Sequence, residues 1–336
     1  MLHFLPADGK MEERKGDDKM RHIFVINPKA GKEKNREKFE ANILAAGKKL
    51  NKKVEIYETT AAGDGEDFVR RTSAAKSPDE KIRFYACGGD GAVNEIFNGA
   101  YGFDNVEVGV IPMGTGNDFI RNFGTAEQFR DIEAQLQGEA VECDLIRYVE
   151  YLDGTAKQPR YCANMFNIGF DCNVVDQTAK AKKWPLINGS LAYLISVFIM
   201  LIKKKGANLR VEFEDGEVFD DKLLLMAIAN GCYCGGGWRS NPIAALDDGI
   251  MDIGLIRDIP RRQFPALLPK YSKGTHLDYK GIEKILIYKK SRTLTITANG
   301  ENMRLCTDGE ITDAEKVTFE MVPDAIRVAV PLGAGA

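Results

Sequence analysis

Two glycine-rich segments of the sequence each place a carboxylate where it could hold a phosphate group through a metal ion. Residues 88–91 read Gly-Gly-Asp-Gly, and residues 114–118 read Gly-Thr-Gly-Asn-Asp. Glycine lets backbone N–H groups approach a phosphate closely, and a helix N-terminus attracts the same anion. Asp90 and Asp118 could hold Mg²⁺ against phosphate oxygens. The first segment alone also fits a tight turn with a helix-capping aspartate, but the second repeats its design and adds the hydroxyl of Thr115.

Both segments follow short apolar runs that alternate with helical patterns. The runs at 22–26, 54–58, 82–87 and 106–111 predict strands, and the patterns at 33–50, 64–75, 91–99, 117–122 and 126–137 predict helices. This alternation predicts an α/β domain with a parallel sheet flanked by helices. Because ligands bind at the carboxyl ends of the strands of such a sheet, the four loops that follow the strands should meet at one edge.

The second half of the chain has a different sequence pattern. Beyond about residue 140, strand-like runs dominate and are separated by turn signals such as Glu214-Asp215-Gly216 and Asn299-Gly300. Two helical insertions interrupt them, near 173–204 and 261–272. We therefore predict a β-rich C-terminal domain with an antiparallel sandwich at 140–321, after a nucleotide-binding domain at 20–139. Residues 1–19 are expected to be disordered or an extension, and the chain end from about 322 to 336 could return to the first domain.

Composition limits the function classes. The 336-residue chain has a net charge of −3, which argues against a broad nucleic-acid surface. Its seven scattered cysteines fit buried thiols in a reducing cytosol better than disulfides or a zinc site. An apolar stretch at 186–202 is slightly short for a membrane span, so any membrane contact is expected to be peripheral. Lys203, Lys204 and Lys205 follow it and could touch anionic headgroups or simply complement a helix C-terminus.

Two common nucleotide motifs are absent, whereas an ordered set of other motifs is present. The chain has neither a P-loop nor a G-x-G-x-x-G opening its first helix. It does contain Asn-Pro-x-x-Gly at 27–31, Gly-Gly-Asp-Gly at 88–91 with Asn94-Glu95, and Gly-Thr-x-Asn-Asp-Phe at 114–119. The second half adds three glycines at 235–237, Pro242, Asp-Asp-Gly-Ile-Met-Asp at 247–252 and Thr-Asp-Gly-Glu at 307–310. In this order the motifs resemble the diacylglycerol kinase catalytic-domain superfamily, which also holds sphingosine kinases and bacterial lipid kinases.

The resemblance implies an NAD-kinase/phosphofructokinase-like first domain, with ATP lying between the two domains. Glu310 matches the general base that accepts the lipid hydroxyl proton, although its segment alone reads as a plain hairpin turn. Asp90, Asp118 and Asp308 match the catalytic residues that organise Mg²⁺, partly through water. The positions that match the nucleotide site are Asn27, Pro28, Lys29, Ala30, Gly31, Thr59, Gly88, Gly89, Asp90, Gly91, Ala92, Val93, Asn94, Glu95, Gly114, Thr115 and Asn117.

One further metal site and one departure follow from the same comparison of motifs. Asp248, with the carbonyl groups of Ala245 and Ile250, matches a structural Mg²⁺ site, although an Asp-Gly turn would read similarly. The family often has threonine after its Gly-Gly-Asp-Gly motif, where this chain has Ala92. A hydroxyl group near the phosphates is therefore missing, and backbone donors together with Thr115 would have to replace it.

The expected function is ATP- and Mg²⁺-dependent transfer of phosphate to a hydroxyl group of a membrane lipid, with diacylglycerol as the leading candidate. A sphingoid base, phosphatidylglycerol, an undecaprenol-like alcohol, a soluble NAD-type substrate and non-catalytic lipid binding are the alternatives. The enzyme is expected in the cytoplasm, reversibly at the inner face of the membrane, with homodimerisation open. The lipid could lie along a set of apolar residues, although most of them are more typical of an ordinary core: Phe166, Phe170, Trp184, Leu186, Leu191, Tyr193, Leu194 and Phe198.

Overall fold

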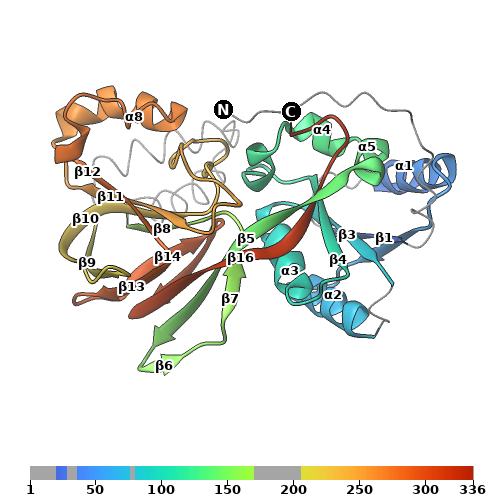
Figure 1. Cartoon of the computed structure of the whole chain (residues 1–336), viewed down its shortest axis with the longest axis horizontal. Helices are drawn as coiled ribbons and strands as arrows, with labels where there is room; N and C mark the ends of the chain where they lie inside the picture. The colour runs from blue at the N-terminus through green and yellow to red at the C-terminus, as the bar shows by residue number, and fades with distance from the viewer. Residues whose placement is uncertain (1–19, 29–35, 76–79, 170–205, 336) are drawn as a thin grey trace, which may run out of the picture.

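The computed structural model describes residues 20–28, 36–75, 80–169 and 206–335. Figure 1 shows an α/β region on the right and a β-rich region on the left, with two long strands running between them. The expected segment at 1–19 and the helical insertion near 173–204, which includes the apolar stretch 186–202, lie outside the described residues. In the part of the chain that is described, no helix is long and apolar enough to cross a membrane.

The α/β region has the parallel sheet that the sequence predicts. Its strands are β1 (Arg21–Ile26), β2 (Val54–Glu58), β3 (Ile82–Gly88) and β4 (Val106–Pro112). Strand β1 pairs in parallel with β2 and β3, and β3 pairs in parallel with β4, which gives the order β2-β1-β3-β4. The helices are α1 (Arg36–Lys49), α2 (Asp64–Ala74), α3 (Asp90–Ala100), η2 (Phe119–Asn122), α4 (Ala126–Arg130) and α5 (Ile132–Gln137).

Apolar residues on both faces of these strands explain why helices cover both sides of the sheet. Successive strand residues point to opposite faces, so a run such as residues 22–26 supplies two apolar surfaces. Phe24 packs in one cluster with Ile43 of α1 and with residues of α5. Ile23 packs in the other cluster with Val69 of α2 and with residues of α3.

The β-rich region is an antiparallel sandwich around a second apolar core. Its strands are β5 (Glu139–Leu152), β6 (Thr155–Ala156), β7 (Arg160–Cys162), β8 (Met165–Gly169), β9 (Ala207–Phe213), β10 (Val218–Ala229), β11 (Met251–Arg257), β12 (Leu286–Ser291), β13 (Thr293–Ala298), β14 (Met303–Thr307), β15 (Glu310–Ala314) and β16 (Lys316–Val330). Aliphatic and aromatic residues from seven or more of these strands, including Phe166, Met226 and Ile296, fill the core.

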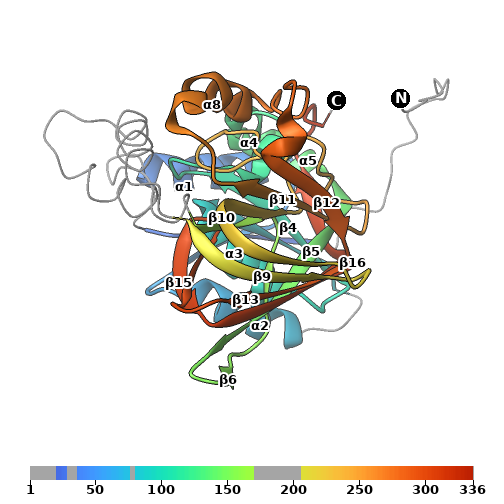
Figure 2. The same cartoon turned by 90° about the vertical axis from the view of Figure 1, so that its left-hand side faces the viewer.

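A helical segment lies on the outside of the sandwich. It contains η3 (Arg261–Gln263), α8 (Phe264–Lys273) and η4 (Ile282–Lys284), which places helix where the insertion at 261–272 was predicted. Figure 2 shows α8 above β11 and β12 at the end of the β-rich region. Phe264 and Leu267 of α8 are buried against Leu224 and Leu225 of β10, so the apolar side of the helix faces the sheet.

Strands β5 and β16 join the two regions into one hydrogen-bonded sheet. The first part of β16 pairs with β13, whereas Arg327–Ala329 pair in parallel with β4. Strand β5 pairs with β16 along almost its whole length, with a bulge between Val322 and Ile326. The predicted boundary at 139/140 therefore falls inside a strand that both regions share, and the end of the chain lies beside β4.

A buried ion pair fixes the edge of the α/β sheet that receives β16. Arg83 donates to Oε2 of Glu107 through Nε at 2.9 Å and Nη2 at 2.6 Å, and Nη1 donates to the carbonyl of Gly138 at 2.9 Å. Both side chains are about 5% exposed, and Arg327 of β16 approaches the other Glu107 oxygen at 3.2 Å. Breaking a buried pair is costly because it leaves an uncompensated charge.

We expect Glu107→Ala to lower the free energy of unfolding by about 3 kcal/mol, because Arg83 would stay buried without its carboxylate. Glu320→Ala is the matched control, since it removes an exposed pair with Arg147 and should cost about 0.5 kcal/mol or less. Urea denaturation followed by tryptophan fluorescence measures both variants. Equal losses for the two variants would contradict a structural role for the buried pair.

Candidate active site

The two glycine-rich loops meet at the carboxyl ends of β3 and β4. Gly88 at the end of β3 lies opposite Pro112 at the end of β4, so the loops leave neighbouring strands in the same direction. A Cβ atom on Gly114 would lie 2.6 Å from the Cα atom of Gly89. The two backbones therefore touch at a distance that only glycine allows.

Asp90, the first residue of α3, fastens the second loop. Its Oδ2 accepts a hydrogen bond from the backbone N–H of Asn117 and its Oδ1 from that of Asp118, both at 2.9 Å. Asn117 has a positive φ of 52°, and its side chain closes the turn by bonding N–H and C=O of Gly114 at 3.0 and 2.8 Å. A Cβ on Gly116 would lie only 2.7 Å from Oδ2 of Asp90. The carboxylate thus sets the shape of the neighbouring loop.

Asp118 links this loop to the β-rich region. Its Oδ2 accepts a hydrogen bond from the N–H of Gly236 at 2.9 Å, in the three-glycine segment 235–237. Its buried Oδ1 has no hydrogen-bond partner among the described residues, although Nε of Arg121 lies 3.5 Å away. Burial, and then the charge of Asp90, raise the pKa of Asp118 to about 6.

Asp308 approaches the same place from the turn between β14 and β15. Asp308 and Gly309 have φ values of 46° and 97°, as a two-residue hairpin turn of type I′ requires. Its Oδ1 accepts from the N–H of Met165 and its Oδ2 from Sγ of Cys162, both at 3.2 Å. Burial, and then the charge of Asp90, raise the pKa of Asp308 to about 7. Asp90 and Asp308 line one small pocket together with Asn94, Phe97 and Phe119.

Glu310 stands next to the start of α3. It is the first residue of β15, is exposed, and places Oε1 3.3 Å from the position that a Cβ on Gly91 would take. The hairpin turn is therefore part of the site, because it brings Glu310 of the second domain to the glycine loop of the first.

Asp90, Asp118 and Asp308 supply carboxylate oxygens, the ligand type that a hard divalent cation prefers. Their carboxylates come from three separate elements. Burial raises the pKa of all three, and the charge of Asp90 adds to the rise for Asp118 and Asp308. No three His, Cys, Asp or Glu side chains in the described ranges lie close enough to form a metal cluster by themselves. Because both oxygens of Asp90 already accept backbone N–H groups, a cation there would keep water or substrate oxygens among its ligands.

The other residues expected at the nucleotide lie around these loops, with three exceptions. Asn27, followed by Pro28, comes directly after β1, and its N–H donates to the carbonyl of Cys87 at 3.2 Å. The N–H of Thr59, after β2, donates to the carbonyl of Ile26 at 3.0 Å, which aligns this loop with the first. Lys29, Ala30 and Gly31 lie outside the described residues.

Residues 92–95 of α3 have distinct surroundings. Val93 is buried in the apolar core, and Asn94 donates through Nδ2 to the carbonyl of Tyr161 at 3.3 Å. Glu95 accepts the N–H of Gly63 through Oε1 at 2.9 Å, which ties α3 to the loop after β2. A Cβ on Gly88 would lie 2.5 Å from Cβ of Ala92, so the residue in place of the usual threonine packs closely on the loop. Thr115 is exposed on the second loop.

At the second predicted metal position, Asp248 has an ammonium partner. Its Oδ2 accepts from Nζ of Lys290 at 2.8 Å, and its Oδ1 accepts from the N–H of Ile250 at 3.3 Å. Lys290 also lies 3.1 Å from the buried Asp252. A structural Mg²⁺ ion held by Asp248 and the carbonyls of Ala245 and Ile250 stays a prediction, and such an ion would compete with Lys290 for the carboxylate.

Several residues that shape the site were not found by sequence reasoning. Buried Asp144 of β5 accepts the N–H groups of Gly249 and Asp324 at 2.7 and 2.9 Å, so it fastens the 247–250 loop to β16. Asn122 accepts the N–H of Cys232 at 2.8 Å, and Asn164 donates to the carbonyl of Tyr233 at 2.8 Å. These bonds hold the chain that leads into the three-glycine segment.

Of the two interpretations of Phe166, the core is confirmed and the lipid cleft is wrong. Phe166 is fully buried and packs edge-on against Tyr148 and Phe319 in the sandwich core, as its place in a central strand requires. The other seven apolar residues proposed for the cleft, Phe170, Trp184, Leu186, Leu191, Tyr193, Leu194 and Phe198, lie outside the described residues.

Comparison with known proteins agrees with this geometry. The family model described as "Diacylglycerol kinase catalytic domain" matches residues 21–148, and the one described as "YegS C-terminal NAD kinase beta sandwich-like domain" matches 164–330. A diacylglycerol kinase of Staphylococcus carnosus is 27% identical over 92% of this chain and 94% of its own length. A Pseudomonas aeruginosa protein named "Probable lipid kinase YegS-like" is 26% identical over 94% and 96%. A diacylglycerol kinase crystal structure from Bacillus anthracis, 19% identical over 92% and 96%, has a TM-score of 0.64.

The match to the diacylglycerol kinase catalytic domain, on an α/β domain with facing glycine loops, identifies a kinase that phosphorylates an alcohol group. The chain belongs to the diacylglycerol kinase-like family of lipid kinases, since the two models together match most of its length.

We expect Gly116→Ala to lower kcat about a hundredfold, because the added methyl group would displace the Asp90 carboxylate 2.7 Å away. Gly254→Ala is the matched control, since its nearest neighbour is a Leu286 methyl group at 3.6 Å, an ordinary contact. Steady-state phosphoryl transfer and thermal melting measure both variants. A Gly116→Ala enzyme with full activity would show that Asp90 does not need this loop geometry.

We expect Cys162→Ala to lower activity about tenfold, because Asp308 would lose one of its two hydrogen-bond donors. Burial raises the pKa of the Cys162 thiol well above its usual value, so the group keeps the proton that it donates. Cys162→Ser keeps a donor and should restore most of the activity. The dependence of rate on Mg²⁺ concentration should shift in the alanine variant only, which an effect on folding alone would not produce.

Proposed function

We propose that this lipid kinase transfers the γ-phosphate of ATP to the free hydroxyl group of diacylglycerol and so forms phosphatidic acid. The observation that supports this most directly is the position of Glu310 against the first turn of α3, beside Asp90 and Asp308. Relatives named diacylglycerol kinase from Staphylococcus carnosus and Bacillus subtilis align with this chain over 94% and 88% of their lengths.

ATP would lie along the edge where the loops after β1 to β4 meet. Gly89, Gly91 and Gly116 place no side chain between the loop backbone and a phosphate, and α3 directs its positive N-terminus at the same place. Asn27, Thr59 and Thr115 supply polar groups along that edge. These features suit the β- and γ-phosphates, whose position governs most of the rate of phosphoryl transfer.

The four carboxylates at the site would have two roles, metal binding and proton acceptance. Mg²⁺, held by Asp90, Asp118 and Asp308 in part through water, would neutralise the charge of the transferring phosphate. One buried oxygen of Asp118 has no hydrogen-bond partner among the described residues and could serve this purpose, and Asp90 holds the loop that positions it. Glu310 is the exposed carboxylate at the site and would accept the proton of the lipid hydroxyl as the oxygen–phosphorus bond forms.

The proposed location of the enzyme follows from its proposed substrate. Diacylglycerol stays in the bilayer, so the reaction would take place where a cytoplasmic protein meets the inner face of the membrane reversibly. A homodimer stays a prediction.

The test is transfer of labelled γ-phosphate from ATP and Mg²⁺ to diacylglycerol, a sphingoid base, phosphatidylglycerol, an undecaprenol-like alcohol and NAD. We expect diacylglycerol to be labelled, with Glu310→Gln reducing kcat at least a hundredfold because the hydroxyl loses its base. Asp90→Asn should reduce it similarly. Asp313→Asn, an exposed carboxylate on the same hairpin, is the matched control and should keep full activity.

Any other result of the phosphate-transfer test would favour a different function or a different base. Labelling of another lipid would overturn only the substrate, and labelling of NAD alone would favour a soluble-substrate kinase. No labelled product from any acceptor would favour a lipid-binding protein without catalysis. Full activity of Glu310→Gln would remove this residue from the role of base.

A further inference from the structure

The segment from Arg257 to Ile285, which contains η3, α8 and η4, concentrates positive charge in a chain whose net charge is −3. It holds seven arginine and lysine residues against three acidic ones. The basic residues described as exposed are Arg257, Arg262, Lys270, Lys273, Lys280 and Lys284. No salt bridge of these six is found among the described residues, whereas cations elsewhere, such as Arg70, Arg160 and Lys289, pair with glutamates. We call this surface the α8 face.

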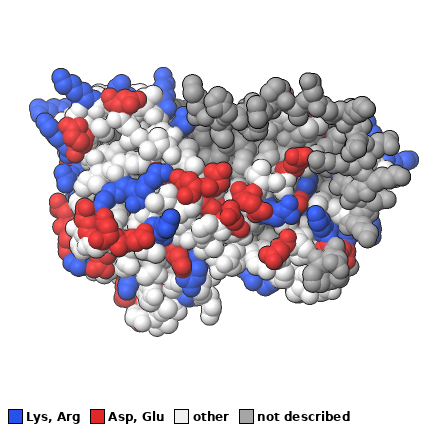
Figure 3. Space-filling view, in the orientation of Figure 1, with Lys and Arg blue, Asp and Glu red and all other residues white. Residues whose placement is uncertain are grey.

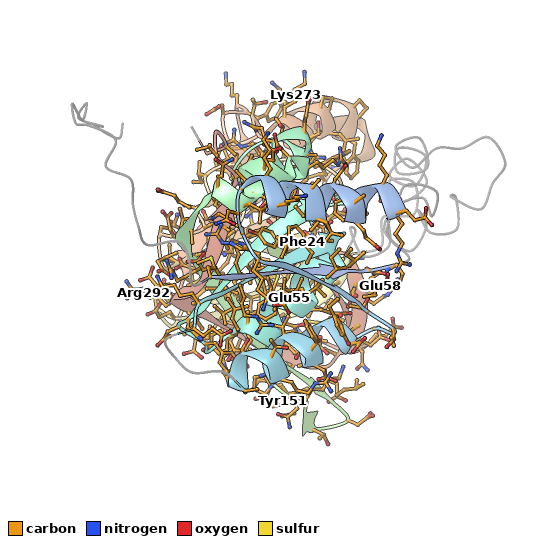
Figure 4. All side chains as sticks on the ribbon, turned by 90° about the vertical axis from the view of Figure 1, so that its right-hand side faces the viewer. Phe24, Glu55, Glu58, Tyr151, Lys273 and Arg292 are labelled. Atoms are coloured by element: carbon orange, nitrogen blue, oxygen red, sulfur yellow. The ribbon has the colours of Figure 1, made fainter. Side chains whose placement is uncertain are left out.

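The charge lies on one side of the molecule. In Figure 3, blue atoms gather along the upper left edge over α8, and red atoms gather lower on the left, over β9 and β10. The exposed acidic residues of that lower area are Glu214, Asp215, Glu217, Asp220 and Asp221. Lys273 stands at the top end of the molecule in Figure 4 and points away from it. Opposite charges at the two ends of one domain orient it in the field of a charged surface.

Helix α8 has a second property that suits a lipid surface. Its apolar stripe, Phe264 and Leu267, is buried against β10. The side facing away from the sheet therefore carries Lys270 and Lys273 together with the small apolar residues Pro265, Ala266 and Pro269, all exposed. A helix with lysines and small apolar groups on its outer side can rest on headgroups without a deep apolar insertion.

An exposed aliphatic side chain stands beside this helix. Ile243 is 56% exposed, one of few large apolar residues so exposed among those described. It follows Pro242, whose Cβ lies 3.0 Å from the position of a Cβ on Gly274, the residue that ends α8. Basic residues with one protruding isoleucine combine electrostatic attraction with a short apolar anchor.

The α8 face is connected to the active site. The N–H of Arg239 donates to the carbonyl of Ser272 in α8 at 3.0 Å, and the Trp238 and Tyr271 rings are in edge contact at 6.4 Å. Gly236, two residues before Trp238, donates its N–H to Asp118. One short loop therefore joins the outer helix to a carboxylate of the site.

We propose that the α8 face is the surface by which this kinase docks on a bilayer that carries anionic phospholipid headgroups. Docking through Lys270, Lys273, Lys284 and Ile243 brings the loop that holds Asp118 close to the lipid surface. The inference rests on the proposed function in one respect, namely that the substrate is a lipid embedded in that bilayer.

The test is co-sedimentation of the full chain with vesicles of phosphatidylcholine alone and with 30 mol% phosphatidylserine. We expect binding to the anionic vesicles only, weakened by salt. Lys270→Gln/Lys273→Gln/Lys284→Gln should lose at least about tenfold in apparent affinity, since each lysine near an anionic surface contributes about fivefold. Lys48→Gln/Lys53→Gln/Lys81→Gln is the matched control, because it removes three exposed lysines near the amino ends of β2 and β3 and should bind like the unchanged protein.

A second pair of variants tests the apolar anchor. Ile243→Ser should lower vesicle affinity severalfold, whereas Leu44→Ser, at a residue 55% exposed on α1, should not. Equal binding by the α8 triple variant and the unchanged protein would overturn the proposal. So would a protein that binds heparin through these lysines but no vesicles, which would identify a different polyanion as the partner.

Activity measurements separate this proposal from the proposed substrate. On short-chain diacylglycerol dispersed in neutral detergent, the triple variant should match the unchanged protein, while on anionic vesicles its rate should fall with its binding. If no diacylglycerol is phosphorylated in detergent by any form, the substrate proposal fails, and the vesicle-binding comparison still decides the docking surface.

Discussion

The pairing of β5 with β16 is the constraint on which the rest of the structure depends. These two strands run through both regions, and the last residues of β16 lie in parallel beside β4. The distance between the glycine loops and the β14–β15 hairpin is therefore fixed by backbone hydrogen bonds rather than by a linker. Glu310 and Asp308 can meet Asp90 and Asp118 because the sheet holds their elements in register.

The site itself uses negative charge for structure as well as for chemistry. Asp90 closes the second loop, Asp118 reaches the three-glycine segment, and Asp308 joins its hairpin to β8. Each carboxylate accepts backbone N–H groups that would otherwise be unpaired at a loop. The repulsion that remains among them would favour a nearby cation, so the three side chains that fasten the loops would also be available to a metal ion.

Local patterns predicted much of this arrangement. The apolar runs and glycine motifs identified the four strands β1 to β4 and the helical segments that follow them, although the segment predicted at 126–137 is two helices, α4 and α5. Strand ends and tight loops are encoded by neighbouring residues. The contacts of Cys162 with Asp308 and of Asp144 with Asp324 could not be predicted, since they join residues far apart in the sequence. Phe166 was left between a lipid cleft and the core for a related reason: an aromatic residue in a strand does not reveal whether it faces a ligand or a core.

The shared strand also has a consequence for how such a protein can be divided or inherited. A fragment that ended at residue 148 would keep the glycine loops but leave the edge of β4 without the partner that the last residues of β16 provide. An unpaired central edge invites association with other chains. The gene segments for the two parts must therefore be inherited together, because the sheet of the first part is completed by residues encoded at the far end of the second.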